Sequence, residues 1–158
     1  MEQKQLVEEQ LEKTIIFDLN GSEYGLPVKI VESIETALPI TRVPHERKYI
    51  KGVINLRGKI IPVIDLRIRL NQKQASDKEN DQIIITRIGE NQVGLIIDNA
   101  NDVLDIPVSL FEDPPELIGT VKKEYIHSIA NIDSRLIILL DIYKLLDLEE
   151  IKLKEMDD

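Results

Sequence analysis

Residues 52–67 read GVINLRGKIIPVIDLR, and this stretch decides the fold. Two apolar runs, Ile50–Leu56 and Lys59–Ile64, flank the turn residues Arg57-Gly58. Two β-branched runs joined by such a pair predict a β-hairpin. Asp65 follows the second run and is placed to cap a short helix. The predicted unit is therefore a strand, a tight turn, a second strand and a capped helical turn.

Three further pairs of apolar runs have the same form. Asn20-Gly21 separates the first pair, and Asn-Gly is favoured in type I′ turns because both residues accept a positive φ. Asp141 ends the last pair and can cap a helix as Asp65 does. The predicted hairpins are Thr14–Leu19 with Glu23–Val28, Ile83–Ile88 with Gln92–Ile97, and Ile126–Ile132 with Arg135–Leu140. Short strands at this spacing are typical of small β-barrels or sandwiches.

The chain also repeats itself. An offset of 69 residues aligns Gly25 with Gly94, and an offset of 76 aligns Asp65 with Asp141. Each copy then holds a hairpin, a variable loop, a second hairpin and a capped helix. We therefore expect a mainly β protein of two five-stranded barrels related by a pseudo-two-fold axis, with short helices and a C-terminal helix. Two barrels packed in this way leave a groove between them, and such junctions are common binding sites.

Domain boundaries follow from the duplication and from the polar stretch NQKQASDKEND. Charged ends without a strand pattern are expected to be mobile. We predict a first barrel at 14–70 with the C-terminal segment 142–150, a polar linker at 71–81, a second barrel at 82–141, and mobile tails at 1–13 and 151–158.

Composition narrows the functional classes. The 158 residues carry 20 basic and 29 acidic side chains, so the net charge is −9 and a nucleic acid is not an expected partner. Cysteine is absent, which excludes disulfides, thiolate nucleophiles and zinc–thiolate sites. No stretch looks like an export signal or a membrane span, which points to a cytoplasmic protein without membrane insertion.

The sequence carries no recognisable catalytic motif. His45 and His127 are the only histidines, and neither has a visible partner for general base catalysis. The carboxylates near Asp98 and Asp102 resemble a calcium loop superficially, but Ala100 stands at a ligand position. We therefore expect no catalytic residue, no metal and no cofactor. A small β-barrel hydrolase that uses Asp98 and Asp102 remains the alternative, and a convergent pocket would reveal it.

The two hairpin tips differ between the copies. Arg57-Gly58 in the first copy aligns with Asp133-Ser134 in the second. Duplicated scaffolds diverge where their partners differ, so Arg57 is a candidate contact residue. The alternative is that Arg57 is only a turn residue before the glycine that the turn prefers.

The stretch at 52–67 resembles the signature of the CheW family of bacterial chemotaxis coupling proteins. Val43-Pro44, Val93–Asp98 and Arg135–Asp141 resemble the same family in kind and order, and the likeness extends from about Thr14 to Leu148. The resemblance implies two SH3-like five-stranded barrels. It also implies a non-catalytic adaptor that links methyl-accepting chemoreceptors to the histidine kinase CheA, in the cytoplasm and recruited to receptor arrays at the inner face of the membrane.

The resemblance further implies two binding surfaces. Receptor tips are helical hairpins that dock into the groove between the barrels, and by position the receptor-binding residues are Ile15, Val28, Val31, Arg57 and Ala100. Some members of the family have Glu where this chain has Ser33, and the flanking Glu32 and Glu35 are possible substitutes. The residues expected to face the kinase regulatory domain are Ile40, Val43, Pro44, Tyr49 and Ile50.

Two arrangements of such a module are conceivable. It can be part of a larger protein, such as CheV with its receiver domain or the kinase itself, or it can be a separate adaptor. The initial Met1 and the charged end Lys152–Asp158, which lacks a receiver-like pattern, favour the separate adaptor.

Overall fold

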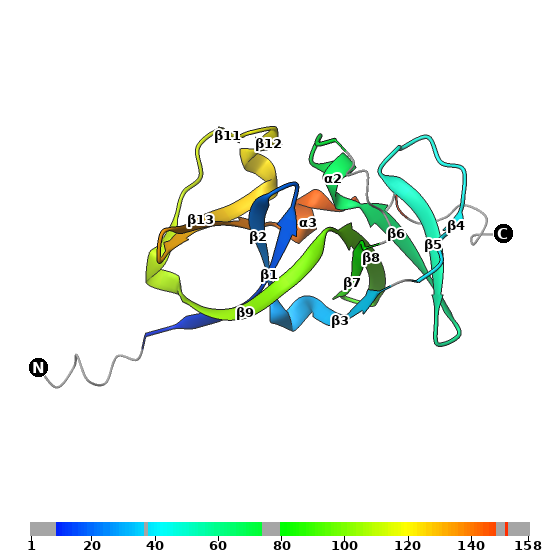
Figure 1. The fold of residues 1–158 in the computed structure, drawn as a ribbon, viewed down its shortest axis with the longest axis horizontal. Coiled ribbons are helices and arrows are strands. Elements are labelled where there is room, and N and C mark those ends of the chain that lie inside the picture. The colour runs from blue at the N-terminus through cyan, green and yellow to red at the C-terminus, as the bar shows by residue number, and fades with distance from the viewer. Residues whose placement is uncertain (1–8, 37, 74–79, 148–150, 152–158) are drawn as a thin grey trace, which may run out of the picture.

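The computed structural model describes residues 9–36, 38–73, 80–147 and 151, and it is mainly β (Figure 1). The strands are β1 (Leu11–Leu19), β2 (Ser22–Pro27), β3 (Val31–Thr36), β4 (Thr41–Arg42), β5 (Ile50–Leu56), β6 (Lys59–Asp65), β7 (Gln82–Ile88), β8 (Asn91–Ile97), β9 (Asn99–Pro107), β10 (Phe111–Glu112), β11 (Leu117–Ile118), β12 (Val121–Lys122), β13 (Ile126–Ile132) and β14 (Arg135–Leu140). The helical segments are η1 (Val28–Ile30), α2 (Leu66–Arg69), η2 (Val108–Leu110), η3 (Lys123–Tyr125) and α3 (Ile142–Leu145).

Twelve of these strands form two six-stranded sheets of matching order, and β11 pairs with β12 in a separate two-stranded sheet. Sheet A runs β10-β13-β14-β2-β1-β9, and sheet B, read from its other edge, runs β4-β5-β6-β8-β7-β3. Each sheet therefore has the five longer strands that were predicted and one additional edge strand of two residues, β4 or β10. In Figure 1 the two sheets lie side by side, with β9 and β3 on the same side of the molecule.

Strand register confirms the duplication residue by residue. Ile16 is paired with Gly25 in sheet A, and Ile85 is paired with Gly94 in sheet B, at the predicted offset of 69. Both glycines are needed, because an added Cβ would lie 2.7 Å from a side-chain atom of Thr14 at Gly25 and 2.6 Å from one of Val63 at Gly94. All four predicted hairpins are present, and the two sheets are related copies.

The sheets nevertheless divide the chain differently from the predicted boundaries 14–70 and 82–141. Sheet A combines β1 and β2 of the first copy with strands of the second copy, through the parallel pairing of β14 with β2. Sheet B combines β7 and β8 with strands of the first copy, through the parallel pairing of β6 with β8. Each copy thus gives its first hairpin to the other sheet, and neither predicted segment forms a sheet by itself.

Three apolar clusters hold this arrangement together. Ile16, Ala130 and Ile137 belong to a small cluster of sheet A, and their equivalents in the other copy belong to a small cluster of sheet B. The largest cluster draws on both sheets, with Phe17 and Leu26 from sheet A and Leu95 from sheet B. Because each fully buried aliphatic or aromatic side chain contributes about 1.5–3 kcal/mol, this shared core makes the two sheets one folding unit.

Both predicted helix caps are present. The Asp65 carboxylate accepts a hydrogen bond from the Arg67 backbone N–H, and Asp141 accepts bonds from the backbone N–H groups of Tyr143 and Lys144. The caps end β6 and β14 at equivalent points and turn the chain into α2 and α3, and a further helical residue, Ile151, follows α3.

The ends of the chain are better ordered than predicted. Leu11–Lys13, assigned to a mobile tail, form the start of β1 and pair with β9. Ile151, assigned to the other tail, is buried in the largest cluster. The rest of the predicted tails, at 1–8 and 152–158, and residues 74–79 of the predicted linker lie outside the described residues.

Candidate interaction surface

Val31 and Ala100 occupy equivalent positions at the two outer strands β3 and β9. Both are half-buried and pack against the largest cluster. Val31 pairs with Thr86 and Ala100 with Phe17, next to the same irregularity of strand register in each sheet. The two strands therefore present matching small apolar side chains at the margin of the shared core.

Ile15 and Val28 lie close to this margin with different exposure. Ile15 is buried in β1, and its backbone neighbours are Leu26 on β2 and Val103 on β9. Val28 opens η1 and is half-buried. Side chains directly opposite on adjacent strands point to the same face. An apolar row thus runs from Leu26 through Ile15 to Val103, which is 53% exposed.

An equivalent row crosses sheet B. Leu95 pairs with Ile84, and Ile84 pairs with Ile34, which is 37% exposed. The two rows begin in the shared core and end in solvent at Val103 and Ile34. Sequence reasoning missed these two residues, although the offset of 69 relates them. The signal available in the sequence was their equivalence at the offset of 69.

Arg57 lies at the tip of the β5–β6 hairpin with a left-handed φ of 52°, followed by Gly58 at 85°. Its side chain is 75% exposed, and Nη2 lies 3.9 Å from the Glu35 carboxylate on β3. Glu35 is four residues from Val31, so the Arg57 contact lies about 13 Å along β3 from Val31. Arg57 is therefore both a turn residue and an exposed cation next to β3.

The residues predicted to face the kinase divide between surface and core. Val43, Pro44 and Ile50 line a hollow of about 650 Å³. Ile40 is exposed at 36%, whereas Tyr49 and Ile50 are buried, and the Tyr49 ring packs on the Arg69 guanidinium. Burial leaves Tyr49 and Ile50 little surface to offer a partner.

The same hollow is basic. Arg42, Arg47, Lys48 and Lys51 line it, and among the residues that the structure describes no carboxylate does. Next to Lys51, Gly52 allows β4 to approach β5, because a Cβ at this position would lie 2.0 Å from the backbone oxygen of Thr41. A protein with a net charge of −9 thus carries a concentrated positive patch beside the predicted kinase residues.

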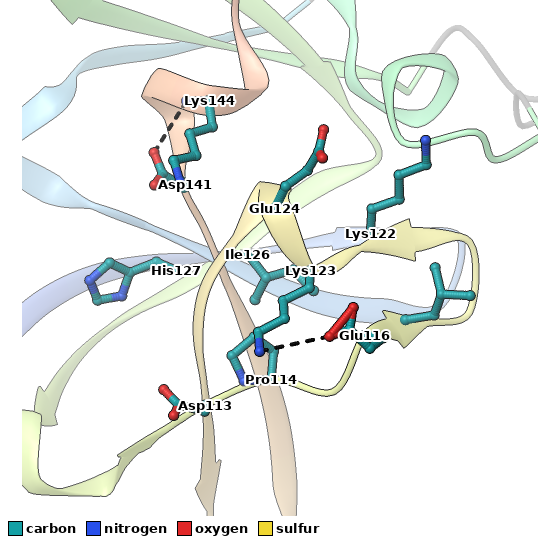
Figure 2. Close-up of a pocket in the computed structure, with 11 residues that line it drawn as sticks. Asp113, Pro114, Glu116, Lys122, Lys123, Glu124, Ile126, His127, Asp141 and Lys144 are labelled. Carbon is teal, nitrogen blue, oxygen red and sulfur yellow. Dashed lines mark hydrogen bonds and ion pairs between the residues drawn. The ribbon is translucent and has the colours of Figure 1, made fainter.

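The second copy has an equivalent hollow of different charge (Figure 2). It measures about 670 Å³, and Ile126 and His127 line it at the places of Ile50 and Lys51. Carboxylates and ammonium groups alternate around it, and Lys123 Nζ lies 4.0 Å from Glu116. The two hollows therefore have similar volumes but differ in the charged side chains that line them.

The carboxylates considered for catalysis are occupied by structural contacts. Asp98 forms an ion pair of 2.8 Å with Arg67 and accepts a hydrogen bond from the Asn20 backbone. Asp102 lies 3.7 Å from Arg135. Across the described residues, no group of three or more His, Cys, Asp or Glu side chains could hold a metal ion. The convergent carboxylate pocket that a hydrolase needs is not formed by Asp98 and Asp102.

One further property concerns membranes. Within the described part of the chain, no helix has the length and apolarity required to span a bilayer.

Comparison with known proteins agrees with this arrangement. A family model described as "CheW-like domain" matches residues 13–150. The chemotaxis protein CheW of Bacillus subtilis is 42% identical over 138 residues, which cover 87% of this chain and 88% of the relative. The chemotaxis protein CheW of Klebsiella aerogenes is 37% identical over 139 residues, covering 88% of this chain and 84% of the relative.

A solved structure has the same fold. The crystal structure of the scaffolding protein TtCheW from Thermoanaerobacter tengcongensis superposes with a TM-score of 0.82 at 31% identity, covering 92% of this chain and 99% of that one. This family consists of non-catalytic scaffold or adaptor proteins, so the hydrolase alternative is rejected. The family model spans most of the chain and both of these relatives exceed 30% identity, so the chain belongs to the family of CheW-like domains.

Proposed function

We propose that this protein is a cytoplasmic chemotaxis adaptor that couples methyl-accepting chemoreceptors to the histidine kinase CheA in arrays at the inner face of the membrane. The observation that carries the proposal is the family match over residues 13–150 on a fold with two diverged surfaces. Coupling requires that the assembly favour one kinase state over another, typically by about 1–3 kcal/mol.

The margin between β3 and β9 supports the receptor assignment. A helix that docks on a protein surface buries apolar side chains at helical spacing. The rows that end at Ile34 and Val103 supply apolar area, and Val31 and Ala100 lie on the same two strands. Arg57 and Glu35 add charged groups at the other end of β3. We assign this margin, including Ile34 and Val103, to the receptor helix.

The basic hollow supports the kinase assignment. Ile40, Val43 and Pro44 supply exposed apolar contacts, and the surrounding cations select an acidic surface of the kinase. Tyr49 and Ile50 support the wall of the hollow from within the core.

The test is co-sedimentation of the full chain with a receptor cytoplasmic fragment, with and without kinase. Val31→Asp places a charge at the apolar margin and should reduce receptor binding at least tenfold, whereas Val31→Thr should change it little. Arg57→Ala should weaken binding to receptor or kinase, and Asp133→Ala at the equivalent tip serves as its control.

Circular dichroism and the melting temperature establish that each variant is folded. Normal receptor affinity of a folded Val31→Asp variant would mean that the receptor binds elsewhere. Unchanged binding of Arg57→Ala to both partners would remove Arg57 from the surface.

A further inference from the structure

The helical turn α2, which follows β6 of sheet B, contains a buried cation. The Arg67 side chain has no exposed surface, and carboxylates surround its guanidinium. Nε lies 3.1 Å from Asp65, Nη2 lies 2.8 Å from Asp81, and Nη1 lies 2.8 Å from Asp98. Burial alone would lower the pKa of Arg67, but the hydrogen bonds to Asp81 and Asp65 outweigh it, so the net pKa is raised. The site is built to hold a guanidinium away from water.

The duplication assigns a counterpart to each member of this site. The offset of 76 places Asp141 where Asp65 stands and Tyr143 where Arg67 stands. The offset of 69 places Glu12 at the position of Asp81 and Lys29 at that of Asp98. Tyr143 is 68% exposed, so its side chain does not fill the equivalent interior of sheet A.

A cavity of about 280 Å³ occupies that place, and we name it the Tyr143 cavity. Glu12, Asp141 and Tyr143 line it together with the apolar side chains Leu139 and Phe111. A water molecule occupies about 30 Å³ in the liquid, so the cavity is large enough to hold a long side chain. Asp141 Oδ1 accepts both hydrogen bonds from the α3 backbone. In the same way, Asp65 Oδ1 accepts the hydrogen bond from the α2 backbone.

We propose that the Tyr143 cavity binds the arginine side chain of a partner protein. Its guanidinium meets the Asp141 and Glu12 carboxylates, and its aliphatic stem lies along Leu139 and Phe111. Lys29 replaces the third carboxylate, so the cation is held by two acids and can leave again. Pro27 and Lys29 also line the cavity on either side of Val28, so a partner at the receptor margin can reach it.

The binding test needs neither receptor nor kinase. The 15N-labelled full chain is titrated with N-acetyl-L-arginine amide and, as a neutral matched control, with N-acetyl-L-citrulline amide. Arginine amide should give saturable shifts of the Phe111, His127 and Tyr143 amides, and citrulline amide should bind at least tenfold more weakly. The double variant Glu12→Gln with Asp141→Asn should lose at least tenfold in arginine binding, while the Asn oxygen retains the helix cap.

A second test introduces an arginine into the adaptor itself, at position 143. Tyr143→Arg should raise the melting temperature by about 2–4 °C, by reproducing the Arg67 arrangement, and should abolish the shifts from arginine amide. Tyr143→Gln is the neutral control, and Asp141→Asn should cancel the gain.

Equal shifts from both amides, or no saturable shift at the cavity, would overturn the proposal. An unchanged or lower melting temperature of Tyr143→Arg relative to Tyr143→Gln would do the same. Because both tests use the adaptor alone, they leave the proposed chemotaxis function untouched if they fail.

Discussion

Gly58 and Ser134 occupy the same position in equivalent hairpin turns, yet only one of them is glycine. Both have a left-handed backbone, with φ of 85° and 68°. A side chain in this region costs about 1–2 kcal/mol, because its Cβ crowds the following carbonyl oxygen. Ser134 therefore holds a small amount of strain that Gly58 avoids.

Replacing Ser134 with glycine should stabilise the protein. The relief of backbone strain in the folded state outweighs the stabilisation of the unfolded state by the greater chain entropy of glycine. We expect the free energy of unfolding to rise by about 0.5 kcal/mol. The melting temperature should rise by about 1–2 °C in differential scanning calorimetry. Gly58→Ser is the reciprocal control and should lower it, and a lower melting temperature of Ser134→Gly would contradict the argument.

Glu23 and Arg135 link the parallel strands β2 and β14. The hydrogen bond from Arg135 lowers the pKa of Glu23, against the opposing effect of burial. A carboxyl whose folded pKa is lowered contributes stability above its ordinary pKa, and this contribution is lost as the pH falls through the lowered value.

Glu23→Gln should therefore reduce stability at pH 7 and should reduce it less at pH 3, which lies below the ordinary pKa of a glutamate carboxyl. We expect a loss of about 0.2–1 kcal/mol at pH 7, the range of partly exposed ion pairs. Urea unfolding at the two pH values measures the difference. An equal loss at both would show that the charge of Glu23 is not what contributes.

At the scale of elements, one side chain joins the two halves. The Arg69 guanidinium carbon lies 4.8 Å from the centroid of the Tyr49 ring and 4.7 Å from that of Tyr125. These tyrosines are equivalent in the two copies, and Arg69 Nε also donates a 2.7 Å hydrogen bond to the carbonyl oxygen of Leu145, its own counterpart. Arg69 thus ties α2 to α3 near the pseudo-two-fold axis.

Arg69→Met should destabilise the fold by about 2 kcal/mol. The change removes two cation–π contacts of about 0.5–1 kcal/mol each and one hydrogen bond of about 1 kcal/mol. Arg69→Lys keeps the charge and should lose less. Chemical denaturation of both variants gives the comparison, and equal stability of wild type and Arg69→Met would show that this contact contributes nothing.

At the scale of the molecule, hairpin exchange predicts that neither half of the sequence folds alone. Residues 1–73 lack the strands that complete both sheets, and so do residues 80–158. Each fragment should be unfolded by circular dichroism, and an equimolar mixture should recover the strand signal. An independently folded 1–73 fragment would contradict the exchange.

Local pattern was sufficient for the hairpins, the caps and the repeat, because each depends on residues that are close in sequence. It could not predict the parallel pairs β14–β2 and β6–β8, since the same apolar runs would satisfy several strand partners. The candidate site residues likewise include some that the sequence could place and some that it could not. Val31 and Ala100, which the family resemblance implied, occupy equivalent positions of the repeat, whereas Tyr49 was assigned to the surface because a short apolar run does not reveal which of its faces is covered.

The parallel pairing of strands from different copies has a consequence for ancestry. A polypeptide with only one copy would have the strands for half of each sheet and would find the complement in a second molecule. The smallest stable form of this architecture is therefore an intertwined homodimer, and gene duplication converts that dimer into one chain whose formerly identical faces are free to evolve separately.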